Sequence, residues 1–215
     1  MRVIPIEGLP EIRAGDDVAA LIADAADFEK GDVLVVSHKV ISKAEGRVVR
    51  GEKLELVLRE ARRIVRRRGE LVIAETRHGF VCAAAGVDAS NAPEPGTLVL
   101  LPLDPDDSAA RLSERLGVAV IVSDSFGRPW RRGTTDVAIG VAGLAPLIDL
   151  RGGRDAMGYE LRSTEIAVAD EIAGAAELVK GKTAGVPAAI VRGLSLAGEG
   201  TARDLVMPTE RDLFR

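Results

Sequence analysis

The sequence predicts a mixed α/β (α+β) fold with irregular mixed sheets and helices. Short apolar runs rich in Val, Ile and Leu recur between turn residues, as expected of buried strands. Other segments carry apolar residues at helical spacing, and the two kinds do not alternate regularly enough for a doubly wound sheet. Hydrophobic residues make up 47% of the 215-residue chain, which is enough for a packed core.

In the first half of the chain, the predicted strands are residues 3–6, 32–36 and 71–74, and the predicted helices are residues 18–28 and 54–68. Asp16 or Asp17 is expected to cap the first helix, because a carboxylate oxygen there accepts a hydrogen bond from a free backbone N–H. The second helix is predicted from Leu54 and Leu58, which are four residues apart and so lie on one helix face. The six arginines within residues 59–68 are then expected on a solvated helix face, with a docking patch for an acidic substrate as the alternative.

In the second half, the predicted strands are residues 98–103, 118–122 and 188–192, and the predicted helices are residues 109–116 and 164–179. Residues 137–147 form an unbroken run of small apolar residues whose element type the sequence leaves open. The run suits a core or a dimer interface equally. No internal repeat or low-complexity linker interrupts the chain, so residues 1–215 are expected to form a single domain.

Composition excludes several classes of function. The net charge is −4 and aromatic residues are only 3%, so neither a basic field nor a stacking platform for nucleic acid is expected. No apolar run approaches a membrane span, and no signal peptide is recognisable, so we expect no membrane partner. Cys82 is the only cysteine and is expected to be a small buried residue. A reducing, cytoplasmic location fits this cysteine usage.

Two Gly- and Ser-rich segments each carry an acid, and both are expected to be loops. Residues 75–91 contain Asp88, and residues 122–131 contain Asp124 and Ser125 directly after an apolar strand. Two carboxylates and a hydroxyl suit a divalent metal that holds phosphate oxygens. The structural alternatives are a local turn for Asp88 and a helix cap for Asp124.

Basic residues at three places suit anionic ligands. Lys39 and Lys43 share one face if their segment is helical, where they would either contact phosphate or lie in solvent. Residues 181–183, Gly-Lys-Thr, lack the first glycine of a P-loop, but a loop flanked by glycines can still offer backbone N–H groups to phosphate. Arg128 and Arg131 offer forked donors for an acidic substrate.

Six short motifs occur in a fixed order along the chain. They are residues 8–10 (Gly-Leu-Pro), 42–46 (Ser-Lys-Ala-Glu-Gly), 77–82 (Arg-His-Gly-Phe-Val-Cys), 85–91 (Ala-Gly-Val-Asp-Ala-Ser-Asn), 124–131 (Asp-Ser-Phe-Gly-Arg-Pro-Trp-Arg) and 191–194 (Val-Arg-Gly-Leu). Together they closely resemble the γ-glutamyl ligase family of the deazaflavin coenzyme F-420. The resemblance runs from about Ile4 to Gly198 and implies a single intertwined domain that forms homodimers, here without the reductase domain found in some relatives.

The resemblance implies an enzyme that joins L-glutamate to the lactyl-phosphate side chain of the deazaflavin coenzyme precursor. GTP would be the co-substrate and Mg²⁺ or Mn²⁺ the metal cofactor. Transfer of the γ-phosphoryl group of GTP would give an acyl phosphate, and the glutamate amine would then displace phosphate. Further glutamates would follow through γ-links.

The resemblance also assigns residues. Asp88 and Asp124 would hold one metal, Ser125 would help to hold a second, and Asp88, Asp124 and Lys43 would be catalytic. Nucleotide contacts map onto Leu9, Pro10, Glu11, Ile12, His38, Lys39, Lys43 and Asn91, and onto the loop over residues 180–186, with Gly181, Lys182, Thr183 and Gly185. Lys182 stands where members with a second metal ligand carry an acid or an amide, so the number of metals stays open.

Two other functions stay open. A metal-dependent nucleotide phosphohydrolase would use water in place of the glutamate amine and need the same metal site. A non-catalytic deazaflavin- or nucleotide-binding module would need no pair of metal-binding carboxylates.

Overall fold

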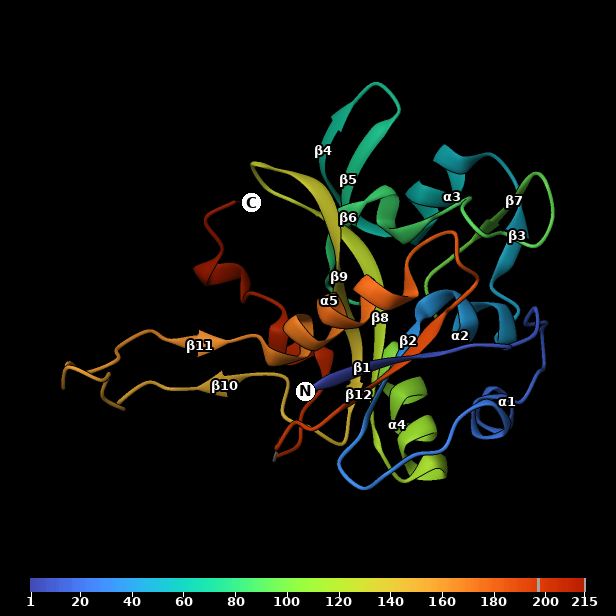
Figure 1. Cartoon of the computed structure of the whole chain (residues 1–215). Coiled ribbons are helices and arrows are strands. Elements are labelled where there is room, and N and C mark those ends of the chain that lie inside the picture. The colour runs from blue at the N-terminus through green and yellow to red at the C-terminus, as the bar shows by residue number, and fades with distance from the viewer. Residues whose placement is uncertain (197, 215) are drawn as a thin grey trace.

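The computed structural model describes residues 1–196 and 198–214, and its centre is a five-stranded sheet. The strand order is β1 (Arg2–Ile6), β12 (Ala188–Arg192), β2 (Val33–Ser37), β8 (Ala119–Arg128) and β9 (Arg131–Ala142). Strands β2 and β8 are parallel, and the other neighbours in this sheet are antiparallel (Figure 1). The predicted mixed α/β class with irregular sheets is confirmed.

Four helices accompany this sheet: α1 (Val18–Ala25), α2 (His38–Ala44), α4 (Pro105–Leu116) and α5 (Val168–Lys180). Helices α4 and α5 both pack on β9. The side chain of Asp17 caps α1 by accepting a hydrogen bond from Ala20 N at 3.1 Å, as predicted. The cap of α4 is Asp104, which accepts from Asp107 N, so this helix begins four residues earlier than expected.

Strand β9 is an edge strand whose backbone N–H groups are taken by carboxylates from the packed helices. Asp136 N donates to Glu177 Oε2, and Ala138 N donates to Asp170 Oδ1. Val141 N donates to Asp106 Oδ1 at 2.9 Å. Since unpaired edge donors invite pairing with another chain, these contacts close the edge and fix both helices on it.

A second group of elements has its own apolar cluster. It contains the sheet β4 (Ala61–Arg68), β5 (Leu71–Thr76) and β6 (Val81–Ala83), the pair β3 (Val48–Arg50) and β7 (Thr97–Val99), and α3 (Lys53–Glu60). Leu56 and Val57 of α3 are buried against Val72 and Leu100. Short 3-10 turns are η1 (Ala84–Gly86), η2 (Ala202–Leu205) and η3 (Thr209–Arg211).

The predicted helix over residues 54–68 is wrong in its second half. Helix α3 ends at Glu60, and residues 61–68 form a strand that pairs with β5. Leu56 and Val57 are the residues that anchor the helix in the apolar cluster, whereas six of the eight residues of β4 are exposed. A continued helix would bury little more, while the strand satisfies its backbone through β5. The arginine run therefore lies on a strand and not on a helix face.

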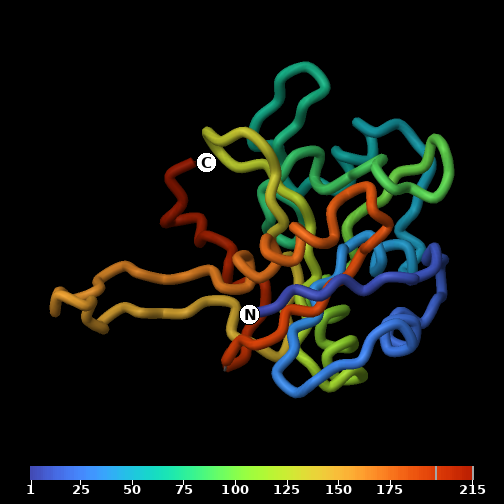
Figure 2. Tube along the Cα trace, in the orientation of Figure 1, coloured from blue at the N-terminus to red at the C-terminus, as the bar shows by residue number. Residues whose placement is uncertain are grey.

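Other boundaries also differ. The run at residues 137–147 is the second half of β9 and the turn after it, and the strand predicted over residues 98–103 ends at Val99. The helix predicted from residue 164 begins at Val168, because β11 (Glu165–Ile166) first pairs with β10 (Ile148–Asp149). Figure 2 shows the chain around β10 and β11 projecting from the body as a long arm. Within the described residues, no helix has the length and apolarity needed to cross a bilayer.

Candidate functional site

A cavity of about 390 Å³ lies at the carboxyl end of β2 and beside the middle of β8, where the parallel pairing of the two strands ends at Ser37 and Ser123. Open α/β sheets bind ligands at this edge, because chain segments diverge there. Four segments that are distant in sequence meet at it: residues 9–12, 37–43, 123–125 and 180–187. The volume suits a small molecule or nucleotide.

Most of the residues singled out in the sequence line this one cavity. They are Leu9, Pro10, Glu11, Ile12, Lys39, Lys43, Asn91, Asp124, Ser125, Gly181, Lys182, Thr183 and Gly185. His38, Asp88, Arg128 and Arg131 are not in its wall. The structure thus gathers the predicted nucleotide segments around one space, while their ligand stays a prediction.

Helix α2 places the two predicted lysines on the cavity. Ser37 caps the helix, and the helical turn brings Lys39 and Lys43 to the same side, as predicted. Each ammonium meets a carboxylate: Lys39 Nζ lies 2.9 Å from Asp88 Oδ2, and Lys43 Nζ donates to Glu11 Oε1 at 2.5 Å. The two lysine side chains are 12% and 10% exposed, so their charges act in a partly dehydrated space.

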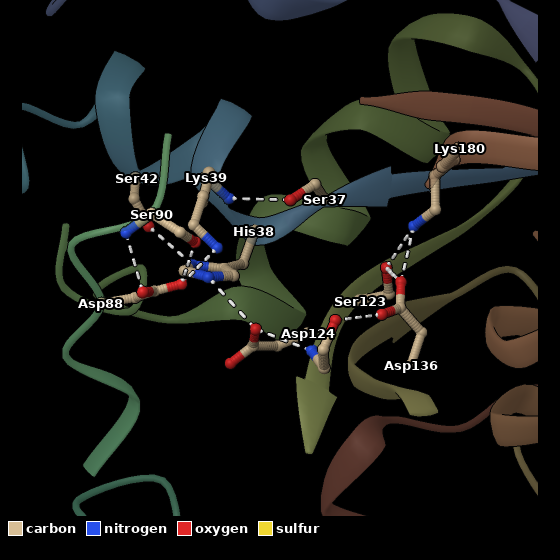
Figure 3. A network of polar contacts seen from close by, with 11 residues as sticks. Ser37, His38, Lys39, Ser42, Asp88, Ser90, Ser123, Asp124, Asp136 and Lys180 are labelled. Atoms are coloured by element: carbon tan, nitrogen blue, oxygen red, sulfur yellow. Dashed lines mark hydrogen bonds and ion pairs between the residues drawn. The ribbon is translucent and has the colours of Figure 1, made fainter. Parts of the chain in front are cut away.

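Asp88 follows η1 in a turn whose local hydrogen bonds fix its carboxylate. Ser90 Oγ donates to Asp88 Oδ2 at 2.6 Å, and Ser90 N donates to Oδ1 at 2.8 Å. Burial favours a raised pKa for Asp88, but the two Ser90 hydrogen bonds and the Lys39 ammonium together lower it well below the usual value. The local-turn alternative therefore holds, and the same carboxylate also faces Lys39 (Figure 3).

Asp124 lies inside β8 and not in a loop beyond it, which corrects the prediction from the sequence. Its Oδ1 accepts a hydrogen bond from Ser125 N at 2.7 Å and lies 3.3 Å from His38 Nε2. Burial would raise the pKa of Asp124, but the His38 and Lys39 charges hold it below the usual value. Asp124 is thus an ionised carboxylate on the cavity wall.

His38 lies behind Asp124 and is fully buried. Its Nδ1 is 3.3 Å from Ser42 Oγ, one helical turn away. The contact between Nε2 and Asp124 is close but lacks good hydrogen-bond alignment. The side chain is therefore placed to support the carboxylate and not to line the cavity (Figure 3).

Three polar residues of the site were missed in the sequence: Ser123, Asp136 and Glu177. A fourth, Lys180, begins the loop that the resemblance assigned to the nucleotide. Lys180 Nζ donates to Asp136 Oδ2 at 2.8 Å and to Ser123 Oγ at 2.7 Å. Ser125 Oγ donates to Asp136 Oδ1 at 2.6 Å. The signal that would have found Asp136 is the β8–β9 hairpin, whose register places it opposite Ser125.

Arg128 and Arg131 lie at the exposed tip of the same hairpin. Arg128 Nη2 donates to the carbonyl of Arg132 at 3.2 Å, and Trp130 packs edge-on against Phe214 with ring centroids 4.9 Å apart. Neither arginine reaches the cavity in this arrangement. Their contact with an acidic substrate stays a prediction.

Cys82 is buried, as predicted. Burial and the nearby Asp124 charge raise the pKa of its thiol to about 12. A thiol that is protonated at neutral pH is a poor nucleophile, so Cys82 is a packing residue.

Asp88 and Asp124 are the carboxylates that fit a divalent ion. Both are ionised, and the Lys39 ammonium lowers the pKa of each. Among residues 1–196 and 198–214, no cluster of three or more acidic, His or Cys side chains could hold a metal by itself. Two carboxylate ligands fit the way Mg²⁺ is commonly held, with phosphate oxygens and water completing the shell.

Known proteins match this chain in sequence over a range that includes the whole cavity wall. The family model described as F420-0:gamma-glutamyl ligase matches residues 8–193. The coenzyme F420:L-glutamate ligase of Methanopyrus kandleri is 42% identical over 247 residues, covering 100% of this chain and 98% of its own. The protein of that name from Methanothermobacter thermautotrophicus is 42% identical over 248 residues, covering 99% and 98%. The one from Archaeoglobus fulgidus is 42% identical over 242 residues, covering 100% and 96%. Every residue that lines the cavity lies within the family match.

Proposed function

The chain belongs to the F420-0:gamma-glutamyl ligase family, and from this premise we propose that it is a GTP-dependent ligase that attaches L-glutamate to the side chain of a coenzyme F420 precursor. The main support for the proposal is that one cavity is lined by Lys39, Lys43 and Asp124 together with the glycine-flanked loop 181–185. Cationic side chains, a carboxylate and the backbone N–H groups of a loop together suit a nucleoside triphosphate with its metal.

The proposed reaction has two steps. First, the γ-phosphoryl group of GTP passes to the precursor carboxylate, which gives GDP and an acyl phosphate. The amine of L-glutamate then attacks the acyl carbon, the C–O bond to phosphate breaks, and inorganic phosphate leaves as the amine loses a proton. Both steps move negative charge on phosphoryl oxygens, so positioning and charge neutralisation supply most of the catalysis.

The cationic residues would act on these oxygens. Lys39 and Lys43 project from one helix into a partly dehydrated space, where a point charge stabilises phosphoryl transfer more strongly than it would in water. Their present partners, Asp88 and Glu11, keep the ammonium groups ordered for phosphate. Loop 181–185 would orient the nucleotide through its backbone N–H groups.

Asp88 and Asp124 would hold the divalent ion, Mg²⁺ or Mn²⁺. When bound, such an ion polarises phosphate oxygens as a Lewis acid. The lowered pKa values keep both carboxylates ionised at neutral pH, which the binding of a hard cation requires. His38 would orient Asp124 from behind.

The test is mass spectrometry of the deazaflavin precursor after incubation with the protein, L-glutamate, GTP and Mg²⁺ or Mn²⁺. Stepwise addition of glutamyl residues that requires GTP is the expected result, and it would also give the number of residues added. Phosphate release with an unchanged precursor would instead identify a nucleotide phosphohydrolase. Binding of the coenzyme without any turnover would identify a non-catalytic module.

We also propose that the chain works as a homodimer in the cytoplasm. The arm around β10 and β11 carries exposed apolar side chains, with Met157 82% and Tyr159 73% exposed. Apolar side chains on a projecting arm suit burial by a second copy. Light scattering coupled to size-exclusion chromatography checks the mass, and a monomer at working concentration would contradict the proposal.

A further inference from the structure

Lys180 is a lysine buried within the wall of the catalytic cavity. It is the last residue of α5 and the first residue of the loop, residues 180–186, that the resemblance assigned to the nucleotide. Its side chain turns inward and is 4% exposed. A buried ammonium is costly unless it is paired and hydrogen-bonded, so its partners define its role.

The partners of Lys180 are Asp136 and Ser123. The ammonium donates to Asp136 Oδ2 at 2.8 Å and to Ser123 Oγ at 2.7 Å (Figure 3). An ammonium group has three N–H donors. Within the described residues the third donor has no partner, and the residue lines the cavity, so this donor is available to a ligand.

Asp136 links Lys180 to Ser125 through hydrogen bonds to both. Its Oδ1 accepts the Ser125 hydroxyl at 2.6 Å, while its Oδ2 accepts from both Ser123 Oγ and Lys180 Nζ. Both carboxylate oxygens of Asp136 are therefore already hydrogen-bonded.

We propose that Lys180 is a fixed cation of this cavity: held by Asp136 and Ser123, it takes the place of a second divalent ion next to Ser125, so that the protein binds one divalent ion, at Asp88 and Asp124. This inference rests on the proposed ligase function. It answers the question of metal number that Lys182 left open in the sequence.

The residues around Ser125 do not fit a second divalent ion while Lys180 is in place. Both oxygens of Asp136 are bonded in a closed setting, where the Asp136 side chain is 8% exposed and that of Lys180 4%. Asp88 also meets a lysine, but its side chain is 38% exposed and can turn toward an ion. Glu177 Oε2 already accepts the backbone N–H of Asp136 at 2.9 Å. A divalent ion would have to break the bond from Lys180 and then lie beside an ammonium of the same sign. Like charges in a partly dehydrated space repel strongly.

The first measurement counts Mn²⁺ on the nucleotide-free wild-type protein. Mn²⁺ alone is titrated in at neutral pH, and the electron paramagnetic resonance signal of free Mn²⁺ gives the bound fraction. Saturation at one ion per chain is expected, with loss of that ion in Asp124→Asn. Saturation at two ions in the wild type would overturn the inference.

The second measurement repeats the count on matched variants. Lys180→Gln removes the fixed charge and is expected to raise the count to two, and Lys180→Gln with Asp136→Asn returns it to one. Lys30→Gln removes the same charge from an exposed lysine outside the cavity wall and is expected to leave the count at one. A folded Lys180→Gln protein, checked by circular dichroism, that still binds one ion would overturn the inference.

Because Lys180→Gln leaves a buried carboxylate unpaired and so destabilises the fold, a third measurement uses the wild type. The ammonium protons of Lys180 are followed by NMR on ¹⁵N-lysine-labelled protein. Their signal is expected to stay protected from exchange at saturating Mg²⁺, and its loss on Mg²⁺ binding would show that an ion displaces the lysine. One bound ion without glutamylated product would overturn the ligase function alone, whereas two ions with full ligase activity would overturn this inference alone.

Discussion

Gly140→Ala tests the packing that holds α4 against β9. A Cβ at residue 140 would lie 2.2 Å from Pro105 O and 2.5 Å from Pro105 C. These are backbone atoms of the first turn of α4, so no side chain can move aside. Asp106, the next residue of that turn, accepts hydrogen bonds from Val141 N and Ala202 N. The added methyl group must therefore displace the helix and strain both bonds.

The expected loss of folding stability in Gly140→Ala follows from this clash with backbone atoms. Overpacking in a core costs about 1–3 kcal/mol, and a clash with backbone belongs at the upper end, about 3 kcal/mol. For a chain of this length, each kcal/mol lowers Tm by about 2–4 °C, so a fall of about 6–12 °C is expected.

The assay is thermal unfolding followed by circular dichroism, with urea unfolding as an independent measure. Gly127→Ala is the matched control, because it lies in the same hairpin, has no positive φ and would place its Cβ in open space. The control is expected to melt within about 2 °C of the wild type, as surface substitutions usually change stability by less than about 0.5 kcal/mol. A Gly140→Ala protein that melts with the control would refute the packing argument.

Three further predictions concern Asp124, His38 and Asp170. Asp124→Asn should abolish metal-dependent turnover with a near-normal melting curve, and near-full activity in the mass-spectrometric assay would contradict its role. His38→Gln should weaken the Mn²⁺ affinity about 10–100-fold, since it removes the group behind a metal ligand, and a titration with unchanged affinity would argue that His38 only fills space. Burial raises the pKa of Asp170, so its contribution to stability is present at low pH and is lost as the pH rises through the folded-state pKa. The Tm of Asp170→Asn minus the Tm of the wild type should therefore increase as the pH rises from 4 to 8. A difference that stays constant or decreases over this range would contradict the prediction.

The sequence predicted the elements whose signal is local. The apolar runs of β1, β2, β5 and β12 and the cap of α1 follow from side-chain pattern and turn chemistry alone. Lys39 and Lys43 were expected to share a face only if their segment is helical, and α2 meets that condition. By contrast, residues 61–68 changed from helix to strand because pairing with β5 outweighs local spacing.

For the candidate site, the sequence determined which chemistry-bearing residues exist, and the tertiary structure decided which of them meet. Asp124 and Ser125 stood out because they follow an apolar run, but their location inside a strand depends on the hairpin partner β9. Asp136 and Lys180 are separated by 44 residues and meet only because α5 packs on that strand. Such contacts depend on strand register and helix packing, which no local periodicity encodes. The residue types alone therefore predicted a phosphate and metal site, and only the packing revealed the buried cation within it.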